Sequence, residues 1–216
     1  MKKPTHEICQ RLIKRYPVLQ PCQEDIIISC KLLIDCFASG HKLLVCGNGG
    51  SAADSLHITG ELMKAFILPR PLQGKDKEAI MSTCSDAQYL LDNLEVALPV
   101  LSLVSETALI TAYSNDRAPD LCFAQQVLGY GNEDDILLAI STSGNSRNVI
   151  FACEVAQAKG LKVILLTGGK GGRLALMVQN KIVVPAFETY AIQELHLPVY
   201  HCLCEAVENE FFGVEQ

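Results

Sequence analysis

The sequence predicts an α/β protein with a doubly wound, five-stranded parallel sheet flanked by helices. Two observations lead to this prediction. Five short runs rich in valine, isoleucine and leucine occur between residues 42 and 185, and continuous apolar runs are typical of strands that are buried on both faces. Helical apolar spacing separates the runs, and alternation of strands with helices implies right-handed crossovers between parallel strands.

Two helices are predicted before the sheet. The stretch "HEICQRLIKRY" (6–16) ends before Pro17, and "QEDIIISCKLLIDCFASG" (23–40) opens with acidic residues and closes at Gly40. Glycine is common just after the end of a helix. We therefore expect an N-terminal helical extension over about residues 1–40.

Apolar runs predict the strands, and helical apolar spacing predicts the remaining helices. A segment over about 73–98 is longer than a usual connection, and its second half has the spacing of an extra helix. The stretch from 191 to 212 is predicted to be one long C-terminal helix, which Pro198 would kink or locally open without ending it. The predicted strands are residues 42–46, 99–104, 135–141, 162–167 and 181–185.

Length and composition favour a single domain over residues 1–216 in a cytoplasmic protein. Of the 216 residues 49% are hydrophobic and 19% are charged, which is enough apolar mass for one core. A net charge of −6 disfavours nucleic acid as a ligand. No uninterrupted apolar run is long enough for a transmembrane helix, and the N-terminus lacks the apolar region of a signal peptide. The ten cysteines, mostly within apolar segments, are expected to be reduced core thiols.

The first predicted strand leads into a glycine-rich turn, "CGNGGSAADSLH" (46–57). Such a turn between a strand and a helix commonly holds a phosphate, because the N–H groups at a helix N-terminus attract anions. A dinucleotide site would also need an acidic residue at the end of the next strand, about 20 residues further on. That residue is absent, so the dinucleotide interpretation is rejected.

A second turn, "STSGNS" (141–146), lies between another predicted strand and a helix. It places the hydroxyl groups of four residues at a helix N-terminus, where the helix dipole favours an anion. An ordinary helix cap would explain one hydroxyl but not four. No Walker lysine follows either turn, so a nucleoside triphosphate is not expected. The four hydroxyl-bearing residues are Ser141, Thr142, Ser143 and Ser146.

These two turns, followed by "IQELHLPVYH" (192–201), resemble the sugar isomerase (SIS) domain family and, within it, the phosphoheptose isomerases. The resemblance covers about residues 20–212, apart from the segment 73–98. It implies an SIS fold and an aldose–ketose isomerase. The implied substrate is a phosphorylated sugar, most simply sedoheptulose 7-phosphate, which becomes D-glycero-D-manno-heptose 7-phosphate through an enediol-like intermediate.

The resemblance assigns a metal site and an acid–base pair. His57 and Glu61 are spaced i, i+4 and share one helix face, whereas Gln193 and His201 are eight residues apart on the terminal helix. The resemblance implies that these four residues hold one zinc ion and that Glu61 and His201 move the protons. From the residues alone, the spacing of His57 and Glu61 is more often that of an ordinary helix-surface pair. His196 matches no metal position.

Helix geometry limits how these ligands can meet. Eight residues of helix rise about 12 Å, so Gln193 and His201 cannot easily reach one ion from one straight helix. Either a kink at Pro198 brings them together or a neighbouring copy of the chain supplies a ligand. We favour the second, because the resemblance implies a homotetramer with sites at subunit interfaces.

The resemblance also assigns the residues that bind the substrate. Glu61 and Gln193 are among them. The others are assigned to the phosphate (Ser51, Ser141, Thr142, Ser143 and Ser146), to the sugar (Asn48, Gly49 and Gly50) and to the sugar hydroxyls (Asn115 and Asp116).

Two substitutions and the segment 73–98 depart from the family pattern. Ala65, beside Lys64, stands where the family typically has an arginine, and Tyr190 stands where it has an aspartate. These differences leave open a ketose phosphate other than the seven-carbon one.

The alternative function is that of a non-catalytic phosphosugar-binding protein that regulates by protein contact. The ending "CLCEAVENEFF" (202–212) is similar to that of the DnaA initiator-associating protein, an SIS-domain relative of this kind. That relative lacks a histidine at the position of His201. The presence of His57, Glu61, Gln193 and His201 in this chain therefore favours the enzyme.

Overall fold

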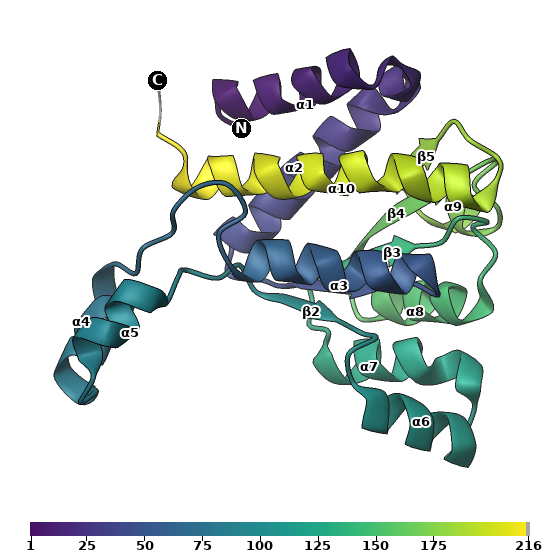
Figure 1. Cartoon of the computed structure of the whole chain (residues 1–216). Coiled ribbons are helices and arrows are strands. Elements are labelled where there is room, and N and C mark those ends of the chain that lie inside the picture. Colours follow the sequence, from purple (N-terminus) through teal and green to yellow (C-terminus); the bar gives the residue numbers. More distant parts are fainter. Residues whose placement is uncertain (215–216) are drawn as a thin grey trace.

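The computed structural model describes residues 1–214 and confirms the predicted α/β architecture. Within them, five parallel strands form one sheet in the order β2-β1-β3-β4-β5 (Figure 1). Each predicted strand agrees with the observed strand to within two residues at either end. The strands are β1 (Leu43–Cys46), β2 (Val100–Ser102), β3 (Ile136–Ile140), β4 (Lys162–Gly168) and β5 (Asn180–Val184).

Helices cover both faces of the sheet, so the sheet is the middle of three layers (Figure 1). Every residue of β1 and β3 is buried, as the continuous apolar runs predicted. Alternate strand residues join two separate apolar clusters, one on each face. One face carries α1 (Lys3–Arg15), α2 (Gln23–Ala38), α3 (Gly50–Met63) and α10 (Thr189–Phe212), and the other carries α7 (Cys122–Tyr130), α8 (Arg147–Ala158) and α9 (Leu174–Met177).

The order in which the chain adds strands to the sheet reverses between β1 and β3. β2 lies on one side of this pair, and β4 and β5 lie on the other. From β1 the chain turns to α3 on one face, and from β3 it turns to α8 on the opposite face. The carboxyl ends of β1 and β3 are neighbours in the sheet, since Cys46 is paired with Ala139. A crevice at such a switch point is the usual ligand site of an open parallel sheet.

The long terminal helix α10 is continuous through Pro198. Proline lacks the N–H that would bond to the carbonyl four residues earlier. That carbonyl belongs to Glu194, which is exposed to solvent. Pro198 does not interrupt the helix, in agreement with the prediction of one long element.

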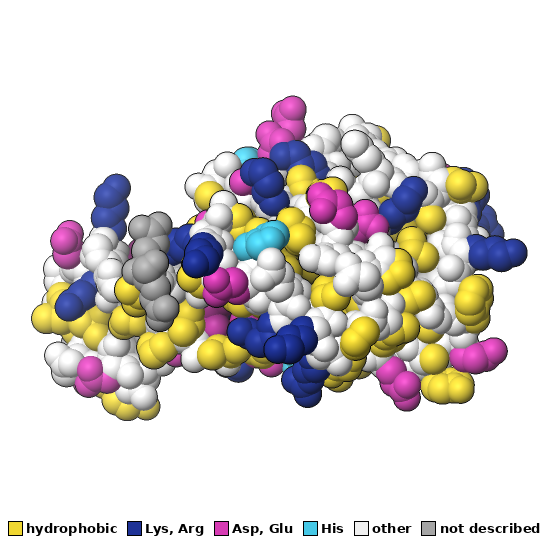
Figure 2. Space-filling view, turned by 90° about the horizontal axis from the view of Figure 1, so that it is seen from above, with side chains coloured by type: hydrophobic (Ala, Val, Ile, Leu, Met, Phe, Trp, Pro, Cys, Tyr) yellow, Lys and Arg dark blue, Asp and Glu magenta, His cyan; other side chains and the backbone are white. Residues whose placement is uncertain are grey.

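The segment 73–98 forms a helical hairpin, in which the extra helix predicted in its second half pairs with another helix that was not predicted. It contains α4 (Gly74–Thr83) and α5 (Ala87–Asn93), neither of which has a buried residue. The hairpin projects from the body of the protein (Figure 1), and apolar side chains gather on the lobe that it forms (Figure 2). Met81 and Tyr89 are among the exposed apolar residues of the hairpin. An antiparallel bridge between Pro71 and Glu95 closes its base.

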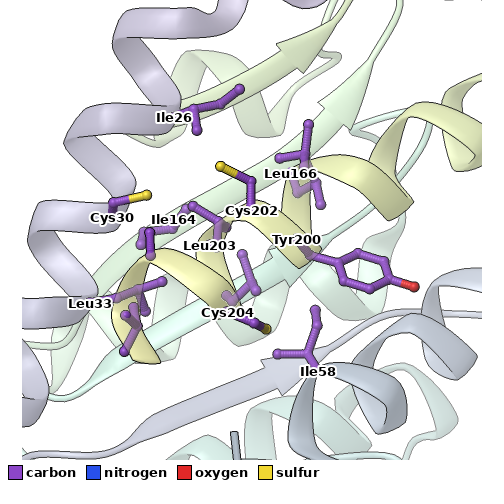
Figure 3. Packing of buried hydrophobic residues seen from close by; sticks show 14 of the residues in the cluster. Ile26, Cys30, Leu33, Ile58, Ile164, Leu166, Tyr200, Cys202, Leu203 and Cys204 are labelled. Carbon is purple, nitrogen blue, oxygen red and sulfur yellow. The ribbon is translucent and has the colours of Figure 1, made fainter. Parts of the chain in front are cut away.

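All ten cysteines are free thiols, as predicted, and nine of them are buried. Figure 3 shows Cys30 and Cys202 among aliphatic side chains between α2 and α10, and Cys204 on the side of α10 that faces Ile58 of α3. The exception is Cys84, which is partly exposed in the hairpin. Across residues 1–214, every helix is too short or too polar to cross a bilayer.

Candidate active site

A pocket of about 300 Å³ lies in the crevice between β1 and β3. The loops that follow these two strands form its walls, and α10 closes one side. We call it the loop pocket. Its lining residues are Asn48, Gly49, Gly50, Ser51, Ile140, Ser141, Thr142, Ser146, Thr189 and Gln193.

Two glycines shape the first loop. Gly49 has a φ of +57°, in the left-handed region where glycine is favoured, and it precedes the first turn of α3. A Cβ atom on Gly50 would collide with the side-chain amide of Gln193. The absence of a side chain at Gly50 therefore lets Gln193 of α10 lie directly against the N-terminus of α3.

Paired amides join the two loops. Asn48 Nδ2 donates to Asn148 Oδ1 at 2.9 Å, and Asn148 Nδ2 donates to Asn48 Oδ1 at 2.8 Å. This reciprocal pair fixes the glycine-rich loop against the start of α8.

Three of the four predicted hydroxyls line the loop pocket, and Ser143 does not. Ser141 is buried, and its Oγ lies 3.0 Å from Ser146 Oγ. Ser146 occupies the N-cap position of α8 without capping it through its side chain, so its hydroxyl stays on the pocket side. Ser143 is exposed and accepts a hydrogen bond from the backbone N–H of Asn145.

A second group of polar side chains, here the histidine cluster, lies further along α3 where it packs against α10. It consists of His57, Glu61, Tyr200 and His201. His57 Nε2 lies 3.1 Å from Glu61 Oε1, and His57 Nδ1 lies 3.0 Å from the Tyr200 hydroxyl. The rings of His57 and His201 are 5.0 Å apart between centroids. The predicted acid–base residues are therefore neighbours within one chain.

Burial controls the charge state of the cluster. Desolvation, together with the nearby charge of His57, lowers the pKa of His201, so its imidazole is neutral near pH 7. Burial raises the pKa of Tyr200 well above its usual range, so the phenol keeps its proton. Lys64 Nζ donates to Glu61 Oε2 at 3.3 Å and so places a cation beside the carboxylate.

The remaining predicted residues lie apart from the cluster. Gln193 lines the loop pocket, near the start of α10, and not the space around His201. Asn115 and Asp116 end α6 (Thr107–Asp116), are exposed and do not line the loop pocket. Tyr190, which replaces the aspartate of the family, is 66% exposed.

Comparisons with known proteins identify the family. The SIS domain model matches residues 90–168. A phosphoheptose isomerase of Thiobacillus denitrificans is 41% identical over 189 residues, which cover 86% of this chain and 83% of that protein. The chain belongs to the phosphoheptose isomerase family. This result confirms the resemblance that the sequence showed.

Solved structures of the family share the fold. A phosphoheptose isomerase from Francisella tularensis is 34% identical with a TM-score of 0.75, and the match covers 90% of this chain and 91% of that one. One from Neisseria gonorrhoeae is 30% identical with a TM-score of 0.73 and 93% of each chain covered. These isomerase relatives do not favour the alternative of a non-catalytic regulator.

Two polar residues near this family site were not predicted from the sequence. Asp54 lies one turn before His57 on α3, and Tyr200 precedes His201 on α10. The only sequence signal was their closeness to predicted site residues. Their contact, 3.3 Å between the hydroxyl and Asp54 Oδ1, depends on the packing of two helices that are distant in sequence.

The four residues predicted to hold a metal ion are all present, but the structure does not bring them together around one point. Within residues 1–214, no three His, Cys, Asp or Glu side chains are arranged as a ready metal site. Nε2 of His201 is nevertheless buried without a hydrogen-bond partner. Two imidazoles and a carboxylate are a donor set that suits zinc, and an unsatisfied ring nitrogen is a suitable ligand atom.

Proposed function

We propose that the chain is an aldose–ketose isomerase that interconverts sedoheptulose 7-phosphate and D-glycero-D-manno-heptose 7-phosphate. The observation that carries the proposal is the placement of two sites on one helix. The loop pocket lies at the N-terminus of α3, and the histidine cluster lies on the same helix further along. One ligand with an anionic end and a reactive carbonyl end can use both.

The loop pocket has the chemistry of a phosphate site. Hydroxyls of Ser51, Ser141, Thr142 and Ser146 line it, and the N-termini of α3 and α8 meet there. Helix N-termini present unpaired N–H groups and a partial positive charge to an anion. Gln193 adds a side-chain amide, which can donate to a phosphate or a sugar hydroxyl.

The distance along α3 matches a sugar of six or seven carbons. From Ser51 to His57 the helix rises about 9 Å, and from Ser51 to Glu61 about 15 Å. An extended carbon chain with bonds of about 1.5 Å advances about 1.3 Å per bond. The reacting carbons of a heptose 7-phosphate therefore lie about 8–10 Å from phosphorus, level with His57 and one helical turn before Glu61, whereas a triose phosphate is too short.

Isomerisation requires one group that removes a proton from the carbon next to the carbonyl and one that moves a proton between the oxygens. Glu61 and His201 supply these two groups. The neutral imidazole of His201 can accept or donate a proton, and the side chain of Glu61 is only 16% exposed. Exclusion of water strengthens their interactions with an enediol-like intermediate.

Zinc is part of the proposal. His57, Glu61, Gln193 and His201 are the residues that would hold one ion per site. Bound zinc would polarise the substrate carbonyl. The support for this is the donor set and the unsatisfied Nε2 of His201.

We also propose a homotetramer with the sites between subunits. Gln193 and His201 lie on the continuous helix α10, and eight helical residues separate them by about 12 Å. A neighbouring copy would bring a second Gln193 or a second histidine cluster to the site. Subunit contacts of this kind would also cover apolar side chains that one chain leaves exposed, such as Leu197 at 41%.

Substitution of the two acid–base residues tests the activity. Glu61→Gln and His201→Ala should each reduce the turnover of sedoheptulose 7-phosphate by at least about 10-fold, because general acid–base catalysis contributes about 10²–10⁴-fold. Glu194→Gln on the exposed face of α10 is the matched control and should leave turnover unchanged. Losses smaller than about 10-fold in both variants would contradict the assigned roles.

A further inference from the structure

Three cysteine side chains that the proposed mechanism does not use meet between α1, α2 and α10. Cys9 Sγ lies 3.8 Å from Cys30 Sγ, and Cys202 Sγ lies 4.0 Å from Cys9 Sγ. In Figure 3 the side chains of Cys30 and Cys202 extend from α2 and α10 into the space between these helices. We call these three residues the thiol cluster. Cys9 is its middle member, because its sulfur contacts both of the others.

The thiol cluster differs from other buried cysteines of the protein. A buried free cysteine behaves as a small apolar residue with a weak S–H donor. Cys22 and Cys36 are of this kind, since each donates to a backbone carbonyl, that of Val183 at 3.1 Å and that of Lys42 at 3.5 Å. In the thiol cluster sulfur faces sulfur, although the three helices are far apart in the sequence. The fold therefore brings together the atoms that a disulfide joins.

One member of the cluster borders a cavity. A pocket of about 380 Å³, here the α1–α10 pocket, is lined by Cys202 together with residues of α1 that include Ile8 and Leu12. A water molecule occupies about 30 Å³, so a molecule as small as hydrogen peroxide fits there. Cys202 is 4% exposed, Cys9 is 1% exposed and Cys30 is fully buried. Cys9 and Cys202 are thus the contacting pair that is nearest to solvent.

Hydrogen bonding makes Cys9 the better nucleophile of the pair. The thiolate is the form of cysteine that peroxides oxidise. Cys202 donates its S–H to Cys9, and a hydrogen bond to the charged form of a group favours that form. The hydrogen bonds with Cys202 and Cys30 lower the pKa of Cys9, against the burial that raises it. Cys9 is therefore expected to attack the oxidant, and Cys202 supplies the second sulfur.

We propose that Cys9 and Cys202 are a modification site for hydrogen peroxide, whose product is a disulfide that joins α1 to α10. The Cys9 sulfur attacks one peroxide oxygen, the O–O bond breaks, and water leaves with the proton of the Cys9 thiol, so Cys9 becomes a sulfenic acid. The Cys202 sulfur then attacks the Cys9 sulfur. The S–O bond breaks, and the hydroxyl group leaves with the Cys202 thiol proton as a second water molecule.

The electrons balance in this sequence, because the peroxide gains the two electrons that the two thiols lose. The sulfurs must approach from 4.0 Å to about 2 Å. A movement of about 2 Å is within the reach of a side-chain rotation. The bond forms beside His201, which precedes Cys202 on α10 and lines the same pocket.

Peptide mapping after mild oxidation tests the pairing. The protein carries Cys84→Ser, because Cys84 is the partly exposed cysteine and would consume oxidant. It is treated with about one equivalent of hydrogen peroxide, alkylated in denaturant and digested with trypsin without reduction. We expect a linked pair of peptides that contain Cys9 and Cys202, lighter by two hydrogen atoms than the free peptides together. Dithiothreitol added before the alkylation should remove the linked pair.

Serine variants identify the sulfurs that form the bond. Cys9→Ser and Cys202→Ser should each lower the yield of the linked peptides at least about 10-fold. Cys204→Ser is the matched control, because Cys204 belongs to the same tryptic peptide as Cys202 but lies on the side of α10 that faces Ile58. Its yield should stay within about twofold of that without the substitution. If a variant does not fold, fragmentation of the linked peptides still places the bond at 202 or at 204.

Three results would overturn the proposal. The first is a main product that links Cys9 to Cys30, and the second is oxidation of Cys9 to a sulfinic acid without a link. The third is a thiol cluster that stays fully open to alkylation at a peroxide dose that oxidises Cys84 in the wild-type protein. Because the readout is a covalent bond and not turnover, the result does not depend on the proposed isomerase activity.

Discussion

Glu208 forms a buried ion pair with Arg70 that secures the segment following α3. Both side chains are at most 1% exposed. The carboxylate accepts from the Arg70 guanidinium and from the backbone N–H groups of Phe66, Ile67 and Leu68 at 2.7–3.0 Å. Each Glu208 oxygen therefore accepts from at least two donors. Glu208 of α10 thus fixes the backbone of residues 66–68, which follow α3 and its part of the histidine cluster.

Glu208→Ala should reduce the free energy of unfolding by about 3–5 kcal/mol, because it leaves the Arg70 charge buried without its partner. Urea unfolding measures the change. Lys31→Ala is the control, since its pair with Asp35 is exposed and should contribute less than about 1 kcal/mol. If Glu208→Ala and Lys31→Ala reduced the free energy of unfolding equally, burial would not explain the contribution of the Arg70–Glu208 pair.

His196 should make stability fall in mild acid. It is fully buried, and burial lowers its pKa to about 4. Between about pH 6.5 and about pH 4, His196 binds a proton in the unfolded chain but not in the folded chain. Stability is therefore lost as the pH falls through this window, by about 2–3 kcal/mol at pH 4.5.

Unfolding curves at pH 7 and pH 4.5 for wild type and His196→Leu test this effect. The variant should lose less stability than wild type on acidification, because leucine does not titrate. Parallel losses in both proteins would show that His196 does not cause the acid sensitivity.

Single residues of the site were predicted with mixed success. Ser51, Ser141, Thr142 and Ser146 could be placed because each follows a buried strand, and parallel strands bring their carboxyl ends to one edge. The outward direction of Ser143, away from the loop pocket, could not be predicted, because it depends on the local turn. Asp54 and Tyr200 could not be foreseen, because their contact depends on the register between α3 and α10.

At the scale of elements, the strands were the most predictable. Their apolar runs are short, continuous and bounded by turns, and burial on both faces leaves little choice of structure. The hairpin of α4 and α5 was harder to predict. α5 was predicted from the apolar spacing in the second half of 73–98, whereas α4 was missed, because it buries none of its side chains and has no strong amphipathic pattern.

Removal of the hairpin should leave the rest of the protein folded. Pro71 and Glu95 are bridged at its base, so a short glycine–serine linker in place of residues 73–94 can join the ends. Segments without buried contacts tolerate such deletions. Thermal unfolding should show a melting temperature within about 5 °C of wild type. An unfolded deletion variant would reveal that the hairpin supports the core.

At the scale of the whole molecule, the separation of Gln193 from the histidine cluster predicts that activity depends on assembly. Specific activity should fall on dilution in parallel with dissociation of the oligomer, followed by light scattering and by native mass spectrometry. His6→Ala is the control. It changes an exposed residue of α1, and its specific activity should depend on dilution as that of wild type does. A monomer with full activity at high dilution would contradict the shared site.

The central claim is that one phosphorylated sugar occupies the loop pocket and the histidine cluster together and exchanges protons with Glu61 and His201. Incubation of the protein with sedoheptulose 7-phosphate in D₂O, followed by NMR, tests it most directly. The account predicts that the aldose appears with solvent deuterium at C2, because an enediol-like intermediate is reprotonated there, and that Glu61→Gln and His201→Ala suppress this signal. Absence of the aldose, or its formation without deuterium at C2, would contradict the account.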